Sequence, residues 1–202
     1  MRLYEYRRTK GYEMLMWVDD EAHDALDRLN GKPKCKKWKP VRVERVRVNM
    51  RESGRPSDAP FMFMSGILVF RRSAVDALRD ILDAHGELLP LHDAGGVELF
   101  AYNPRALEAI DYAQSKGWRN DKGGLDIVET HVFFPSVVEG IDIFRQSEEK
   151  RGMIYLSERF LARWKQANLK GLDFILAWDS DLPPEAQPNV RTSKPVKLST
   201  IK

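Results

Sequence analysis

The chain has 202 residues, of which 43% are hydrophobic and 10% aromatic. Such a composition is ordinary for a folded globular protein and argues against general disorder. No apolar run approaches the roughly 18 residues of a membrane span, and the opening MRLYEYRRTK lacks the apolar stretch of a secretory signal. A single cysteine, Cys35, excludes an internal disulfide and fits a reducing compartment. We therefore expect a cytoplasmic protein with no membrane-spanning segment.

The net charge of +3 is unevenly distributed along the chain. Residues 31–56 contain ten Lys/Arg and two Glu, a local charge of +8, and residues 191–202 add +4. Residues 57–190 carry −7. An acidic body with two basic attachments permits binding to an anionic partner, although a solvated edge is the commoner explanation of such a pattern.

The N-terminal part predicts two strands, a helix and a third strand. Strands are expected over Leu3–Tyr6 and Tyr12–Val18, followed by a helix that begins at Asp19 or Asp20 and ends at Asn30-Gly31. The basic segment then contains VRVERVRV, in which the valines change parity at Glu44-Arg45. A β-bulge at this point would return the valines to one buried face.

Two later stretches predict related strand–helix–strand units, Gly66–Leu91 and Gly152–Trp178. Each has a short apolar run, an amphipathic stripe and a glycine before the return strand. In the second unit, Ser157 is the expected helix N-cap and Lys170-Gly171 the expected end. In the first unit, Ser73 with Asp76 resembles a capping box.

The connecting segments and the C-terminal part complete the expected architecture. Asn103-Pro104 predicts a helix that stops by Gly117, after which WRNDKGG forms a polar loop and Leu125–Phe134 is extended. Prolines mark residues 179–202 as a polar tail. We predict an α+β fold of mixed or mostly antiparallel sheets with a few amphipathic helices. Residues 1–178 would form one globular domain, possibly two-lobed, followed by the tail 179–202.

The motifs of common catalytic and cofactor sites are missing from the sequence. Its four histidines are isolated, and no Cys-x-x-Cys or His-x-x-x-His occurs. Cys35 lies among lysines without an evident general base, and neither a Gly-x-Ser-x-Gly elbow nor a glycine-rich phosphate loop is present. We therefore expect no catalytic residue, no metal and no cofactor. An enzyme whose site is assembled from scattered residues stays open, and a deep pocket of titratable groups would support it.

Nucleic-acid binding is the alternative that the basic segment suggests. Lys32–Lys39 interleaves five lysines with Trp38, and an aromatic ring beside a basic groove can stack on bases. The acidic body would repel phosphates, however, and the sequence has no signature of an established module. A solvated basic loop is the simpler interpretation.

The order of several segments resembles a family of bacterial immunity proteins. These segments are GRPSDAP, GILVFRRSAVDAL, ELFAYNPRALEAID, GIDIFR and RGMIYLSERFLARWKQANLKGLDF. Together they are similar to family eleven of the polymorphic-toxin immunity proteins, formerly a domain of unknown function, over about residues 50–178. The chain departs from the pattern at Arg71-Arg72, where its second unit has Ser157-Glu158.

The resemblance implies a cytoplasmic protein that binds and neutralises a cognate toxin encoded by the adjacent gene. It implies no catalytic residues. Such a function needs aromatic or arginine anchors on an accessible surface. The candidate anchors are two tryptophans, Trp38 in the basic segment and Trp118 in the polar loop, with the neighbouring Arg119 and Asp121. For each tryptophan, partial burial in the core is the simpler expectation.

Overall fold

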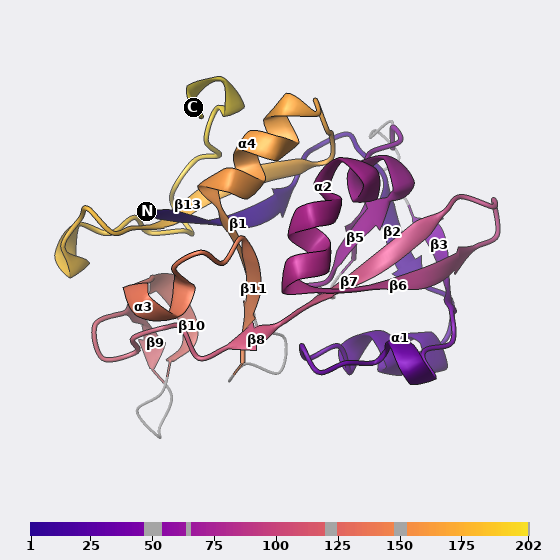
Figure 1. The fold of residues 1–202 in the computed structure, drawn as a ribbon, viewed down its shortest axis with the longest axis horizontal. Coiled ribbons are helices and arrows are strands. Elements are labelled where there is room, and N and C mark those ends of the chain that lie inside the picture. The colour runs from indigo at the N-terminus through magenta and orange to yellow at the C-terminus, as the bar shows by residue number, and fades with distance from the viewer. Residues whose placement is uncertain (47–53, 64–65, 120–124, 148–152, 202) are drawn as a thin grey trace.

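A computed structural model describes residues 1–46, 54–63, 66–119, 125–147 and 153–201. The protein contains two mixed sheets and a separate two-stranded hairpin. Helices α2 and α4 pack against each other where the two mixed sheets meet (Figure 1). This confirms the predicted α+β fold. None of the helices in the described residues is long and apolar enough to cross a membrane.

The first sheet has six strands in the order β4-β2-β3-β6-β7-β5. Their bounds are β2 Met14–Trp17, β3 Val41–Val46, β4 Phe61–Met62, β5 Leu68–Arg71, β6 Gly86–Asp93 and β7 Leu99–Pro104. Helix α1, Asp20–Asp27, lies on one face of this sheet and α2, Arg72–His85, on the other (Figure 1).

The second sheet has five strands in the order β13-β1-β12-β11-β8. Their bounds are β1 Arg2–Arg8, β8 Ala106–Leu107, β11 Ile143–Gln146, β12 Ile154–Ser157 and β13 Leu172–Asp179. Helix α4, Glu158–Gln166, covers one face. The other face is covered by the short helix α3, Pro135–Val138, and by the hairpin of β9, Lys116–Arg119, and β10, Leu125–Thr130 (Figure 1).

The two predicted strand–helix–strand units share one topology. In the first, β5 and β6 both run antiparallel to β7, which lies between them. In the second, β12 and β13 both run antiparallel to β1, which lies between them. Each unit is therefore a parallel strand pair joined by a helix and separated by an inserted antiparallel strand. The inserted strand follows the first unit in the chain but precedes the second.

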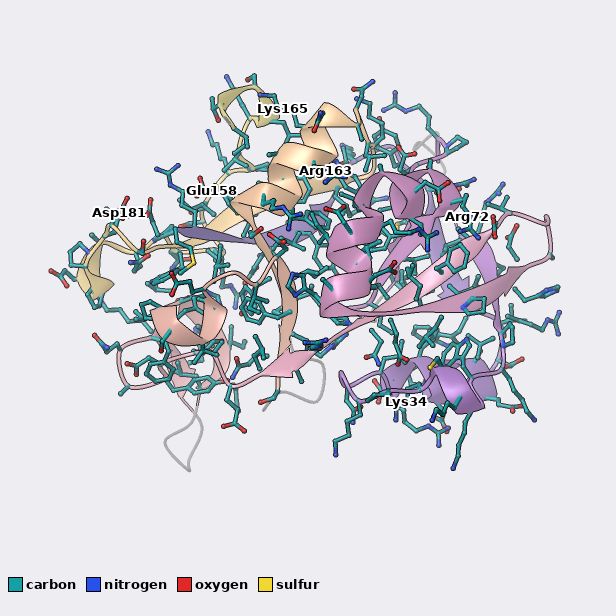
Figure 2. The ribbon with its side chains drawn as sticks, viewed as in Figure 1. Lys34, Arg72, Glu158, Arg163, Lys165 and Asp181 are labelled. Carbon is teal, nitrogen blue, oxygen red and sulfur yellow. The ribbon has the colours of Figure 1, made fainter. Side chains whose placement is uncertain are left out.

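A common hydrophobic core joins the two units through their helices. Its members from the first unit include Phe70, Val75 and Leu78, and those from the second include Phe160 and Trp164. Burial of apolar surface contributes about 25 cal/mol per Å², so this shared core is the main term that holds the two sheets together. Arg163 adds a polar link, because its guanidinium donates to the Ala77 carbonyl of α2 (2.8 Å; Figure 2).

Helix α4 begins as expected and ends differently. The Ser157 hydroxyl accepts from the Phe160 N–H (3.2 Å), which confirms the N-cap. The helix ends at Gln166, four residues before the expected Lys170-Gly171, with Ala167 as its C-cap. The next residue, Asn168, has a φ of +53°. Asparagine tolerates this left-handed conformation better than most residues. Gly171 serves a different purpose, since a Cβ there would lie 2.6 Å from the Ala59 carbonyl oxygen.

The left-handed conformation of Asn168 predicts that alanine at this position destabilises the protein more than glycine does. Asn168→Gly should leave the free energy of unfolding nearly unchanged, whereas Asn168→Ala should lower it by about 1 kcal/mol because of its strained left-handed backbone. Chemical denaturation of the two variants checks this order. Equal stabilities would contradict the role given to Asn168.

Helix α2 lacks the capping box expected at Ser73 and Asp76. Its N-cap is Arg71, which makes no side-chain cap, and the Ser73 hydroxyl donates to Asp58 Oδ1 instead. Asp58 also accepts from the Lys170 N–H (2.8 Å), so it joins the start of α2 to the loop between α4 and β13. The long-range contact replaces the local cap.

Two other local expectations are wrong. Residues 103–117 form no helix; Asn103-Pro104 ends β7, and the chain continues into β8. The Asn103 side chain binds the loop at Gly31 and Lys32 rather than a helix end. Strand β3 pairs with β2 in continuous register from Val43 to Val46, without the expected bulge.

Residues 179–201 of the tail pack on the β9–β10 hairpin and on the five-stranded sheet. The Val190 N–H donates to the Glu129 carbonyl (2.8 Å), and the Val196 N–H to the Phe174 carbonyl (2.8 Å). Ile201 joins the common core, and Lys165 Nζ donates to its carbonyl oxygen (2.6 Å; Figure 2). Within the described residues, the tail therefore contributes to existing cores and to the lining of the cavity described next.

Candidate partner-binding surface

The β9–β10 hairpin carries the most exposed aromatic side chain of the described residues. Trp118 is 65% exposed and lies directly opposite Ile127, which is 40% exposed. Directly opposed residues of an antiparallel pair project from the same face. Phe134, 44% exposed, follows shortly after β10, so three of the six large hydrophobic side chains exposed on the described residues come from this short stretch of chain.

An open cavity of about 670 Å³ adjoins this hairpin. We name it the hairpin cavity. Its lining includes Asp126, Ile127 and Val128 of β10, together with the tail residues Val190, Arg191, Ser193 and Pro195. Residues of β1, β12 and β13 form its floor. The hairpin therefore presents an exposed apolar pair at the mouth of a cavity with mixed polar and apolar walls.

The floor of the hairpin cavity contains a cluster of titratable side chains. Glu5 of β1 is buried, and its Oε2 lies 3.0 Å from Nη2 of Arg7. The His131 Nε2 lies 2.8 Å from the Tyr155 hydroxyl and 3.7 Å from Glu5 Oε1. Leu3 and Glu5 lie on the same face of β1, so a carboxylate occupies a position where the alternation of the strand places buried side chains.

The electrostatics of this floor favour a neutral imidazole. Burial, together with the positive charge of Arg7, lowers the pKa of His131 to about 3. A base this weak gains little from abstracting a proton near neutral pH. The cluster can therefore orient a bound group by hydrogen bonds, with His131 and Tyr155 as neutral partners and Arg7 as a cationic one.

The lowered pKa of His131 predicts that the free energy of unfolding depends on pH. In the unfolded chain histidine has a pKa near 6.5, whereas the folded value is about 3. Between these values the unfolded state binds the extra proton, so the free energy of unfolding falls as the pH falls below 6.5. At pH 4 the loss should be about 3 kcal/mol from this residue. Denaturation at pH 7 and pH 4 should show a smaller pH dependence in His131→Gln. The exposed His92→Gln is the control, and equal pH dependence in both variants would contradict the assignment.

A second surface is formed by the basic loop between α1 and β3. Glu87 of β6 accepts from the Lys34 N–H (2.7 Å), the Cys35 N–H (3.1 Å) and the Asn103 amide (2.8 Å). These bonds hold the pKa of Glu87 below its usual range, against the opposing effect of burial. The loop that sequence patterns predict as solvated is thus fixed to the sheet beneath it.

Of the four residues predicted to bind a partner, the two tryptophans lie on different parts of the molecule. Trp38 lies in the basic loop, packs against the core of the six-stranded sheet and donates its indole N–H to the Pro90 carbonyl (2.8 Å). Trp118 lies on the hairpin beside the other sheet (Figure 1). Arg119 is the last residue of β9, and Asp121 lies outside the described residues. Trp118 is thus accessible to a partner. Trp38 contributes to the packing of the six-stranded sheet in addition to its candidate role as an anchor.

The residues of the cavity floor are those that sequence reasoning misses. They come from three separate parts of the chain: Glu5 and Arg7 from β1, Tyr155 from β12, and His131 from the segment after β10. The pairing of β1 with β12 places Glu5 opposite Tyr155. Their one local signal is Glu5, an acid inside the apolar strand Leu3–Tyr6. Among the described residues, no group of three or more His, Cys, Asp or Glu side chains is placed to hold a metal ion.

No protein-family model matches the chain, and no curated protein matches it significantly.

Proposed function

We propose that this protein is an immunity protein that binds and neutralises a cognate toxin without catalysis. The observation that carries the proposal is the exposure of Trp118 opposite Ile127 at the mouth of the hairpin cavity. Trp is among the residues that contribute most to protein interfaces, especially beside a pocket that a partner can fill. The segment resemblance to immunity proteins supplies the class of partner, a toxin domain encoded by the adjacent gene.

The surface is suited to binding for energetic reasons. Trp118 and Ile127 are presented on paired strands, so little conformational freedom of the backbone is lost on association. The adjoining cavity offers Arg7 and Arg191 as cationic groups and Glu5 and Asp126 as carboxylates. Mixed charges of this kind select a partner by the pattern of its charges rather than by net attraction.

Co-expression tests this proposal directly. The wild-type protein should protect bacterial cells that express the product of the adjacent gene, and the two proteins should copurify. The Trp118→Ala variant should copurify poorly although it accumulates to the same level. If the wild-type protein neither protects nor copurifies, the proposal fails.

Nucleic-acid binding through residues 31–56 is the second candidate, and the anchored basic loop favours it. Lys32, Lys34, Lys36, Lys37 and Lys39 form no ion pair with any described residue. Polyanion binding would make affinity for DNA or RNA fall steeply as salt rises. The absence of binding at low ionic strength would exclude this candidate.

An enzyme assembled from scattered residues would use the hairpin cavity. Its titratable floor fits that possibility, but the low pKa of His131 opposes a general base near neutral pH. We therefore favour stoichiometric binding over turnover, in a cytoplasmic setting.

A further inference from the structure

A second cavity lies between α1 and the basic loop, on the face of the molecule away from α2. Its volume is about 620 Å³, within the range of roughly 300–1,000 Å³ that small-molecule sites occupy. We name it the lysine cavity. Its lining consists of Ala25 of α1, the C-cap residue Arg28 and the loop Pro33–Trp38. Lys34, which is labelled in Figure 2, marks the position of the cavity beside α1.

One part of the lysine cavity is apolar and fixed in place. Ala25, Pro33 and the ring of Trp38 belong to its lining. The hydrogen bond from the indole N–H to the Pro90 carbonyl fixes the Trp38 ring against β6. An aromatic ring that is already ordered can stack on another planar ring at little entropic cost.

The other part of the lining is cationic, with no carboxylate among its residues. It contains Arg28, Lys34, Lys36 and Lys37. Of these, the three lysines make no ion pair with any residue in the described part of the chain. Arg28 donates to the Asp24 carbonyl (2.9 Å) and lies 3.9 Å from the Asp24 carboxylate. The nearest acid of the sheet, Glu87, is engaged by backbone N–H groups of the loop. The positive charge of the cavity is therefore left for a ligand.

The neighbouring charges limit the size of that ligand. Asp24 and Asp27 of α1 are exposed and lie within about one turn of both Ala25 and Arg28 in the sequence. A phosphate chain that continued across α1 would meet these carboxylates. A compact anion contained within the cavity would not.

We propose that the lysine cavity binds a phosphorylated ligand of nucleotide size, with a planar ring on Trp38 and its phosphate among Lys34, Lys36 and Lys37. This chemistry is shared by a free mononucleotide and by the terminal nucleotide of a nucleic acid. The site is separate from the Trp118 surface, so its occupancy does not depend on the proposed toxin binding.

Cys35 provides a local test, because it is the only cysteine in the chain, is exposed and lines the cavity. The rate of its reaction with the neutral reagent N-ethylmaleimide is measured by mass spectrometry on the full chain. Saturating AMP should slow the reaction about tenfold or more. The AMP concentration for half-protection should rise about tenfold or more in Lys36→Gln/Lys37→Gln, which loses two charge-assisted contacts. Lys10→Gln/Lys194→Gln removes the same charge elsewhere and should behave like the wild type.

Three ligand controls separate the parts of the proposal. Adenosine, which lacks phosphate, and inorganic phosphate, which lacks a ring, should each protect Cys35 far less than AMP. A short single-stranded oligodeoxynucleotide should protect no better than AMP. The proposal is overturned if AMP gives no protection, if adenosine or phosphate alone protects equally, if both double variants respond to AMP alike, or if only the oligonucleotide protects.

Discussion

Replacing Trp118 with alanine is expected to weaken toxin binding by about 30-fold or more, the effect of losing an interface anchor. Because the side chain is 65% exposed, its truncation should leave the thermal unfolding midpoint within a degree or two of the wild type. Calorimetric titration of the purified toxin gives the first quantity, and thermal denaturation gives the second.

A matched control distinguishes this anchor from any exposed apolar residue. Leu182 in the tail is 39% exposed and does not line the hairpin cavity. Leu182→Ala should bind the toxin like the wild type. If both variants bind equally well, Trp118 is not an anchor and the docking surface lies elsewhere on the molecule.

Replacing Trp164 with alanine should lower the free energy of unfolding by about 3–5 kcal/mol, the usual cost of a large cavity in a core. The indole is fully buried, stacks on Phe160 (ring centroids 6.1 Å apart) and meets Phe174 edge-on (5.8 Å). It belongs to the core shared by α2 and α4, so its loss should weaken the contact between the two units. Urea denaturation followed by far-UV circular dichroism measures the change.

Trp164→Phe is the informative companion. The indole N–H is buried and has no hydrogen-bond partner in the described part of the protein. Phenylalanine keeps an aromatic ring against Phe160 and removes that unsatisfied donor, so the loss should be only about 1–2 kcal/mol. A phenylalanine variant as unstable as the alanine variant would contradict this account of the core.

The parts of the fold that follow from sequence are those governed by local periodicity. The two strand–helix–strand units have apolar stripes at helical spacing, and both form where expected. Ser157 caps its helix because its hydroxyl accepts from the Phe160 N–H while it donates to Asp142. Ser73 does not, because α2 begins one residue before it, and its hydroxyl donates to Asp58 from inside the first turn. Tertiary contacts of this kind are invisible in a local pattern.

The largest error in the fold has the same origin. Asn103-Pro104 has good helix-start chemistry, yet Asn103 is buried and holds the loop at Gly31 and Lys32 across the sheet. Strand β7 pairs with β5 from Leu99 to Tyr102 and with β6 from Leu99 to Pro104, so Asn103 and Pro104 continue a central strand. The hydrogen bonds of a central strand outweigh a helix cap worth about 1 kcal/mol.

The candidate site is predictable only in part. The polar neighbours of Trp118 in sequence make it a candidate anchor, and its 65% exposure goes against the partial burial that is the simpler expectation for a tryptophan. The floor of the hairpin cavity depends on the pairing of β1 with β12 and on the tail that packs against β10. The first contact joins residues 150 apart, Glu5 and Tyr155, and the second joins residues 61 apart, Glu129 and Val190, so the sequence gives no spacing rule for them.

The most direct test of the account is an activity titration of the purified toxin from the adjacent gene. Residual toxin activity is measured as the immunity protein is added at concentrations well above the dissociation constant. Stoichiometric binding predicts a linear fall that reaches zero at a fixed molar ratio and recovers when the complex is dissociated. Loss of activity at a small fraction of one equivalent, without recovery, would show turnover and contradict the account, as would a toxin that keeps full activity in excess protein.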